Sequence, residues 1–179
     1  MEIHDENKIY WYAVRTFYCK EKSVAAHLEK HNIEFFIPSI YKESITADGK
    51  KHRELVPAIH NLLFVKKTLD EREIKSVMEK CPVSISVIQN KETKQYYRIP
   101  DSQMTELRAI CDPNYKNTLY VDCAFAEARK GDKVKITRGT FKGVTGKLTR
   151  YKNRSYVIIT IANLGVMIHV PKWYCEKQE

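Results

Sequence analysis

The stretch that decides the fold is Lys130-Gly131-Asp132-Lys133-Val134-Lys135-Ile136-Thr137-Arg138-Gly139-Thr140-Phe141-Lys142-Gly143-Val144-Thr145-Gly146-Lys147. Its alternation of apolar and charged residues predicts a strand in which Val134 and Ile136 face inward. Glycines follow at positions 139, 143 and 146, where tight corners or a positive φ would exclude a side chain. We expect Phe141 to fill the core of a small barrel built on this segment.

The residues around this stretch carry more strand signals and no helical pattern. The run Ser155-Tyr156-Val157-Ile158-Ile159-Thr160-Ile161 is apolar and β-branched. Several short strands in so few residues should close into a barrel, because closure hides the strand edges. We therefore predict a small all-β domain over residues 129–179. Residues 113–128 lack a clear period, which predicts a linker.

Charge is distributed unevenly along the chain. Residues 1–112 contain 18 Lys+Arg against 17 Asp+Glu, whereas residues 129–179 contain 12 against 3. The C-terminal segment alone therefore has a net charge of +9, equal to that of the whole chain. Such an asymmetry predicts two domains with different partners, the second facing a polyanion.

The first 112 residues mix helical and strand patterns. Aromatic and β-branched residues predict strands at 10–16, 34–38, 61–65 and 83–89, and Asp48-Gly49 predicts a hairpin turn. Apolar residues at three- and four-residue spacing predict helices at 20–30, after Thr68 or Asp70, and from Asp101. This order indicates an α+β domain over residues 1–112, with helices on a mainly antiparallel sheet.

Several classes of protein and site are disfavoured by what the chain lacks. No apolar run approaches the ~20 residues of a membrane span, and the polar N-terminus is unlike a secretory signal, so we expect a cytoplasmic protein with no membrane partner. The five cysteines form no disulfide or zinc pattern, and we expect reduced, mostly buried thiols. His27 and His31 are half a metal site without a further ligand. No catalytic constellation is evident, which predicts a non-enzymatic monomer without cofactors or metals.

These motifs together resemble a known family. Residues 130–147 resemble a KOW motif, which implies an SH3-like barrel, and three N-terminal segments resemble the NusG N-terminal (NGN) domain: Trp11-Tyr12-Ala13-Val14, Ala26-His27-Leu28-Glu29 and Asn61-Leu62-Leu63-Phe64-Val65. The likeness is greatest to specialised paralogues of the RfaH and UpxY kind. Housekeeping members have Pro-Gly where this chain has His60-Asn61. The resemblance implies a transcription elongation and antitermination factor, specialised for operons such as surface-polysaccharide clusters.

The resemblance also implies a site on the N-terminal domain for the clamp helices of RNA polymerase. Matching positions give Tyr12, Ile59, Leu62 and Phe64 as the apolar contacts, by which the factor would favour the closed clamp and suppress pausing. For Trp11 and Leu63 we expect core positions, whereas Ile59 and Leu62 suit core and patch equally. The side chains of Lys20, Lys22, Ser23 and His27 are expected to meet exposed non-template DNA, or else to form a solvated helix face.

The second domain is expected to recruit another partner. In the family the barrel docks a ribosomal small-subunit protein, and in housekeeping members also Rho; the matching loop here is Asn163-Leu164-Gly165-Val166. The alternative is nascent RNA, with Tyr151 and Tyr156 stacking on bases. Its phosphates would meet one face formed by Lys133, Lys135, Arg138, Lys142, Lys147, Arg150, Lys152 and Arg154. A different class of function is a ribosome-associated KOW protein that binds rRNA.

Overall fold

The computed structural model describes residues 9–90, 93–115, 118–161 and 164–178. The chain divides into two compact units, Met1–Thr105 and Glu106–Glu179. The division falls inside helix α3 (Asp101–Ile110), several residues before the predicted boundary at residue 112. No helix in the described ranges has the length and apolar character needed to cross a membrane.

The first unit is built on an antiparallel sheet of five strands. These are β1 (Tyr10–Thr16), β2 (Phe35–Phe36), β5 (Leu62–Lys66), β6 (Ile85–Val87) and β7 (Arg98–Pro100). The order is β2-β5-β1-β6, with β7 also paired to β1. The predicted strands are confirmed: β1 has its predicted bounds, β5 is shifted by one residue, and β2 and β6 are shorter than predicted. Strand β7 was not predicted, since three residues are too few to show a period.

Two helices cover one face of this sheet. Helix α1 (Glu21–Lys30) contributes Val24 and Leu28 to the core, and α2 (Glu71–Glu79) contributes Ile74 and Met78. Asp70 forms a capping box at the start of α2, satisfying backbone N–H groups that the helix leaves unpaired. Both helices and the apolar spacing that predicted them are confirmed.

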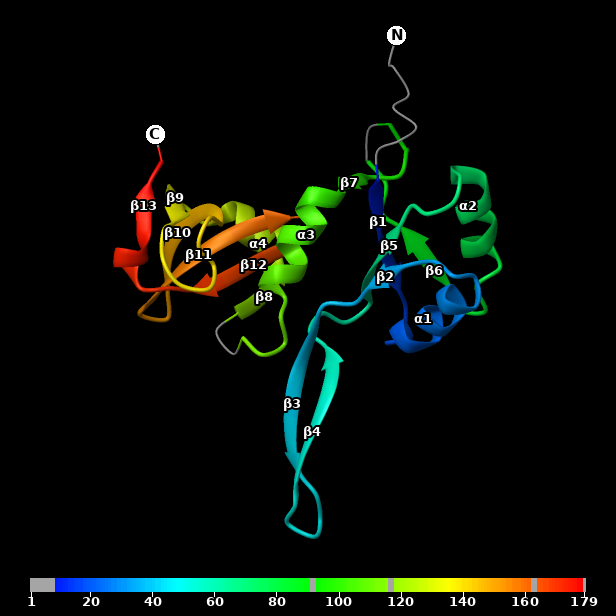
Figure 1. Cartoon of the computed structure of the whole chain (residues 1–179), viewed down its shortest axis with the longest axis horizontal. Helices are drawn as coiled ribbons and strands as arrows, with labels where there is room; N and C mark the ends of the chain where they lie inside the picture. Colours follow the sequence, from blue (N-terminus) through cyan, green and yellow to red (C-terminus); the bar gives the residue numbers. More distant parts are fainter. Residues whose placement is uncertain (1–8, 91–92, 116–117, 162–163, 179) are drawn as a thin grey trace. The chain divides into compact units, whose positions relative to one another are not determined.

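A long hairpin forms a separate two-stranded sheet. It consists of β3 (Ser39–Ile45) and β4 (Lys51–Pro57), joined by the turn around Asp48-Gly49 that the sequence predicts. Every side chain from residue 40 to residue 55 is exposed. In Figure 1 the hairpin extends from the first unit as an arm.

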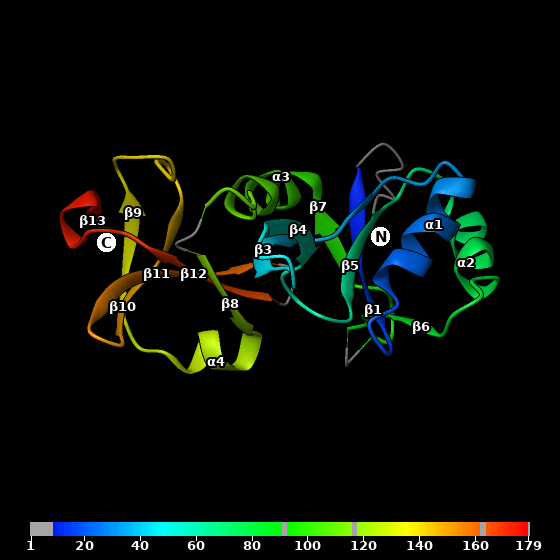
Figure 2. The same ribbon diagram turned by 90° about the horizontal axis from the view of Figure 1, so that it is seen from below.

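The second unit holds one six-stranded antiparallel sheet and a short helix, α4 (Cys123–Ala128). The strands follow the order β13-β9-β10-β11-β12-β8 (Figure 2). Their bounds are β8 (Thr118–Asp122), β9 (Asp132–Ile136), β10 (Thr145–Tyr151), β11 (Arg154–Ile161), β12 (Leu164–His169) and β13 (Cys175–Lys177), with a 3₁₀ turn η1 (Lys172–Tyr174) before β13. The two outer strands, β13 and β8, do not pair among the described residues, so a closed barrel is not confirmed.

The predicted linker is wrong in its greater part. Residues 118–122 form β8, which pairs with β12, and residues 123–128 form α4. Ala126 of α4 packs with Tyr156, Ile158 and Met167 in a core cluster. The sequence pattern is weak here because β8 gains its stability from a partner strand more than 40 residues away, which no local period reveals.

The glycines of the motif have the roles that the sequence predicts, but Phe141 does not. Gly139 and Gly143 have φ of +77° and +97°. A Cβ at Gly146 would lie 2.4 Å from the carbonyl oxygen of Ile158, so only glycine allows that strand approach. Phe141 is half-buried in the β9–β10 loop against the ring of Tyr115, outside the sheet core.

Candidate functional site

Two neighbouring turns of the first unit are tied together by Asn61. Its backbone carbonyl accepts a hydrogen bond from the Thr16 amide at 3.1 Å, and its side-chain oxygen accepts one from the Cys19 amide at 2.8 Å. The Asn61 amide donates to the buried carboxylate of Glu21. We call residues 16–21 and 58–62 the turn platform.

Asn61 adopts a backbone conformation that few residues other than glycine take. Its φ is +63°, in the left-handed region that glycine occupies most easily. Asparagine is one of the few other residues that adopt this conformation routinely. Asn61 therefore supports this turn and makes side-chain hydrogen bonds that a glycine could not make.

The turn platform exposes apolar side chains. Tyr18 is 89% exposed and Phe17 is 42% exposed, while Ile59 and Leu62 are half-buried. Ile59 and Leu62 were predicted as polymerase contacts; Phe17 and Tyr18 were not. Their signal was available, because two aromatic residues directly after a strand and before a helix fall in a turn, where the surface is the default position.

Tyr12 and Phe64 do not belong to this surface. Tyr12 is 1% exposed and packs beneath α1 and α2, and its register partner is Val65. Phe64 pairs with Ala13, so it points to the opposite face of the sheet, where it is fully buried and stacks on Phe36. Because side chains alternate along a strand, the prediction that placed both residues in one patch is corrected.

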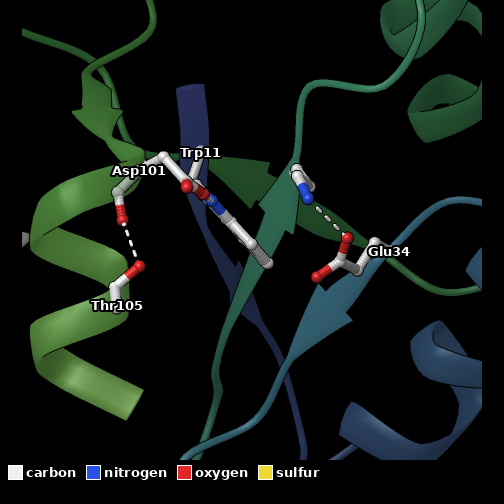
Figure 3. A network of polar contacts seen from close by, with 5 residues as sticks. Trp11, Glu34, Asp101 and Thr105 are labelled. Atoms are coloured by element: carbon white, nitrogen blue, oxygen red, sulfur yellow. Dashed lines mark hydrogen bonds and ion pairs between the residues drawn. The ribbon is translucent and has the colours of Figure 1, made fainter. Parts of the chain in front are cut away.

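Polar contacts fix the face of the sheet opposite α1 and α2 (Figure 3). The Trp11 indole Nε1 donates to Asp101 Oδ1 at 2.7 Å, and Thr105 Oγ1 donates to the Asp101 carbonyl at 3.0 Å. Lys66 Nζ lies 2.7 Å from Glu34 Oε2. Trp11 thereby joins β1 to the first turn of α3 as a core residue, as predicted.

The residues predicted to meet DNA divide into two kinds. Lys20, Lys22 and Ser23 are exposed where α1 begins, and Lys22 lies 3.6 Å from Glu54 of the hairpin. His27 is half-buried, and its Nε2 lies 2.9 Å from the Val77 carbonyl, which can only accept; the imidazole therefore donates. This bond satisfies a carbonyl near the end of α2 and gives His27 a structural role.

Several cations of the second unit fall into two separate groups. Arg138 and Lys142 lie in the β9–β10 loop, whereas a second group lies at the β10–β11 turn, at the other end of the seven-residue strand β10. At about 3.3 Å per residue the two groups are roughly 20 Å apart. The second group consists of Arg150, Lys152 and Arg154.

Lys147 makes hydrogen bonds within the protein, at the end of α4. Its ammonium group donates to the carbonyl oxygens of Ala126, Glu127 and Arg129, each at 3.2 Å. A lysine at the end of a helix satisfies carbonyls that lack an intrahelical partner. Lys147 therefore closes the end of α4, and its prediction as part of a nucleic-acid surface is not supported.

The aromatic residues predicted to stack on bases already make contacts within the protein. Tyr156 is buried in the cluster beneath α4. Tyr151 is half-buried, and the charged groups of Arg129 and Lys152 lie 5.4 Å from its ring centroid. Sequence reasoning missed Trp173 of η1, which is 76% exposed. An aromatic residue beside a lysine and a proline near a strand end was the available signal.

The predicted partner loop is mostly strand. Leu164, Gly165 and Val166 are buried in β12, which lies between β11 and β8. Asn163 lies outside the described residues. Leu164, Gly165 and Val166 are therefore buried strand residues and not a loop, while the contact with a partner stays a prediction.

The ionisable groups with shifted pKa values owe the shifts chiefly to burial. Burial raises the pKa of the Cys111 thiol to about 12, and it raises the pKa values of Tyr120 and Glu106. Of the five cysteines only Cys111 is fully buried, and Cys19 is exposed, so the expectation of mostly buried thiols is wrong. Within the described ranges no three His, Cys, Asp or Glu residues come together as a metal site.

Comparison with known proteins identifies the first unit. The family described as transcription termination factor nusG matches residues 9–108, which is more than half of the 179-residue chain. No curated protein matches the chain. The matched range includes β1, the turn platform, α1, α2 and most of α3. The chain therefore belongs to the NusG family.

Proposed function

We propose that this chain is a transcription elongation factor that grips the clamp helices of RNA polymerase with the turn platform. NusG-family proteins act in transcript elongation and termination, bind RNA polymerase and are not enzymes. The observation that carries the finer proposal is an exposed Tyr18 and Phe17 beside half-buried Ile59 and Leu62, on turns held by Asn61.

This surface has the chemistry of a protein-binding site. A few aromatic and aliphatic anchors supply most of the affinity at protein interfaces, and a helical pair presents apolar side chains to such a site. The hydrogen bonds of Asn61 reduce the freedom of the turns before binding, which lowers the entropy that binding costs. Lys20, Lys22 and Ser23 adjoin the platform, and we assign them contacts to nucleic-acid phosphates.

Binding of this kind acts by selecting a conformation of the polymerase. A factor that holds the closed clamp more tightly than the open clamp shifts the population toward the elongating state. Pausing then falls without any covalent step, in proportion to the difference between the two affinities. The first unit is sufficient for this effect in the proposed mechanism.

We further propose that the chain is a specialised paralogue that serves particular operons. His60-Asn61 in place of Pro-Gly supports this, because Asn61 builds a turn platform that a glycine would leave without its side-chain bonds. The alternative of an rRNA-binding ribosomal protein accounts for the charge of the second unit. It does not account for the family match over the first unit.

The test is transcription in vitro by purified polymerase on a template with a defined pause. Wild type should shorten the pause, and Ile59→Asp and Leu62→Asp should each abolish most of that effect, since an interface hot spot contributes about 2 kcal/mol or more. Circular dichroism and thermal melting check that both variants fold. If the folded variants shorten the pause as wild type does, the turn platform is not the clamp site.

A further inference from the structure

Trp173 is an exposed aromatic ring on a rigid support. The carbonyl of Tyr174 accepts hydrogen bonds from the Thr137 amide at 2.7 Å and from Thr137 Oγ1 at 3.0 Å. The Tyr174 amide donates to Pro171, which closes the 3₁₀ turn. Gly139 lies so close that an added Cβ would be 3.1 Å from the Tyr174 ring. The turn that carries Trp173 is thus fixed to the β9–β10 loop, although the indole itself stays in solvent.

Three cationic residues belong to this turn or to the β9–β10 loop that holds it. Arg138 follows Thr137 directly, Lys142 lies in the same loop, and Lys172 precedes Trp173. All three are exposed, and none has an ion-pair partner in the part of the chain that the structure describes. We call Trp173 with these three cations the Trp173 surface.

We propose that the Trp173 surface binds single-stranded RNA, with one unpaired base stacked on the indole and the adjoining phosphates paired to the cations. Single-stranded nucleic acid is held in this way, by aromatic platforms beside a positively charged track. The ring is available for stacking because so little of it is covered. The choice of RNA rests on the proposed function, since a transcribing polymerase releases its product as a single strand.

Charge favours nucleic acid over a protein partner. Residues 129–179 contain 12 Lys+Arg against 3 Asp+Glu, and a surface of that sign attracts phosphates over distance. The cations at the other end of β10 are less suited, because Arg129 and Lys152 already lie over Tyr151. The Trp173 surface therefore combines an open ring with unpaired cations.

The experiment measures binding of the full chain to a fluorescently labelled 12-nucleotide RNA without secondary structure, by anisotropy at two salt concentrations. Trp173→Ala should bind about tenfold more weakly at both, because stacking depends little on salt, and Trp173→Phe should retain most of the affinity. Arg138→Ala and Lys142→Ala should each reduce the salt slope by about one. The matched control is Tyr97→Ala, an exposed aromatic residue of the first unit, which should bind as wild type.

Three results would overturn the proposal. One is Trp173→Ala with wild-type affinity; another is equal binding of duplex and single-stranded RNA; the third is tighter binding of the matching DNA strand. Loss of a protein partner by Trp173→Ala with RNA binding intact would count against it equally. Trp173→Ala should still bind core polymerase, so failure here is distinct from failure of the turn platform.

Discussion

The two units differ in what they show to solvent. The first has 17 Lys+Arg against 15 Asp+Glu and exposes apolar side chains at its turns, whereas the second has 14 against 7 and buries its apolar residues with the exception of a few such as Trp173 and Leu119. A unit with little net charge and exposed apolar side chains suits a protein partner. A cationic unit with an exposed aromatic ring suits a polyanion. This difference is the basis of our proposal that one chain joins two partners of unlike chemistry.

The largest effect that we expect is a loss of stability, which compares one glycine from each unit. Gly146→Ala places a Cβ 2.4 Å from a backbone oxygen in the second unit, whereas Gly49→Ala in the hairpin of the first unit meets nothing within 4 Å. We expect Gly146→Ala to lower the free energy of unfolding by about 3 kcal/mol, and Gly49→Ala by about 1 kcal/mol because of its positive φ. Urea unfolding followed by circular dichroism measures both; equal effects would contradict the strand approach.

The turn platform is the next to be tested. Asn61→Ala loses the side-chain bond to Cys19 and strains a left-handed turn, and we expect about 2 kcal/mol of destabilisation. Asn61→Gly keeps the left-handed conformation and loses only the hydrogen bond to Cys19, so we expect it to lower the free energy of unfolding by about 1 kcal/mol or less. Thermal melting of the two variants should rank them in that order. A reversed order would show that Asn61 is not serving as a glycine substitute.

Two variants, one in each unit, test whether the turn platform and the Trp173 surface bind different partners. Tyr18→Asp should weaken polymerase binding about tenfold and leave RNA affinity unchanged, while Trp173→Ala should do the reverse. Each variant is thus the control for the other, measured in the same two binding assays. Loss of both activities by either variant would mean that the surfaces are not independent.

The smallest expected effect is a difference in reactivity between two cysteine thiols, and its test needs no substitution. Because burial raises the pKa of Cys111 to about 12, its thiol stays protonated and unreactive at pH 8. Cys19 is exposed, and we expect it to react with a thiol reagent within the native protein. Mass spectrometry after brief labelling reads both positions. Labelling of Cys111 before unfolding would contradict its burial.

Sequence reasoning succeeds where the signal is local. The strand at Tyr10–Thr16 has its predicted bounds, and the cap at Asp70 and the turn at Asp48-Gly49 lie where side-chain chemistry places them. It fails where partners are distant in the chain. Strand β8 depends on β12, and the burial of Tyr156 depends on α4, which itself was predicted as linker.

The site shows the same limit in another form. Family position suggested Tyr12 and Phe64, yet their alternation along paired strands puts them on opposite faces. The pairing register between β1 and β5 decides which side chains share a face, and the period of either strand alone does not reveal it. The positions of Tyr18 and Trp173 next to strand ends were a signal of exposure, but the exposed fraction of each depends on which side chains the rest of the fold leaves uncovered.

The central claim is that the turn platform binds RNA polymerase, and direct binding to immobilised core polymerase without nucleic acid tests it most closely. Phe17 and Tyr97 are a matched pair, each 42% exposed, and Tyr97 lies outside the turn platform. The account predicts that wild type and Tyr97→Asp bind alike and that Phe17→Asp binds at least tenfold more weakly. Equal binding by Phe17→Asp and wild type, with both folded, would contradict it.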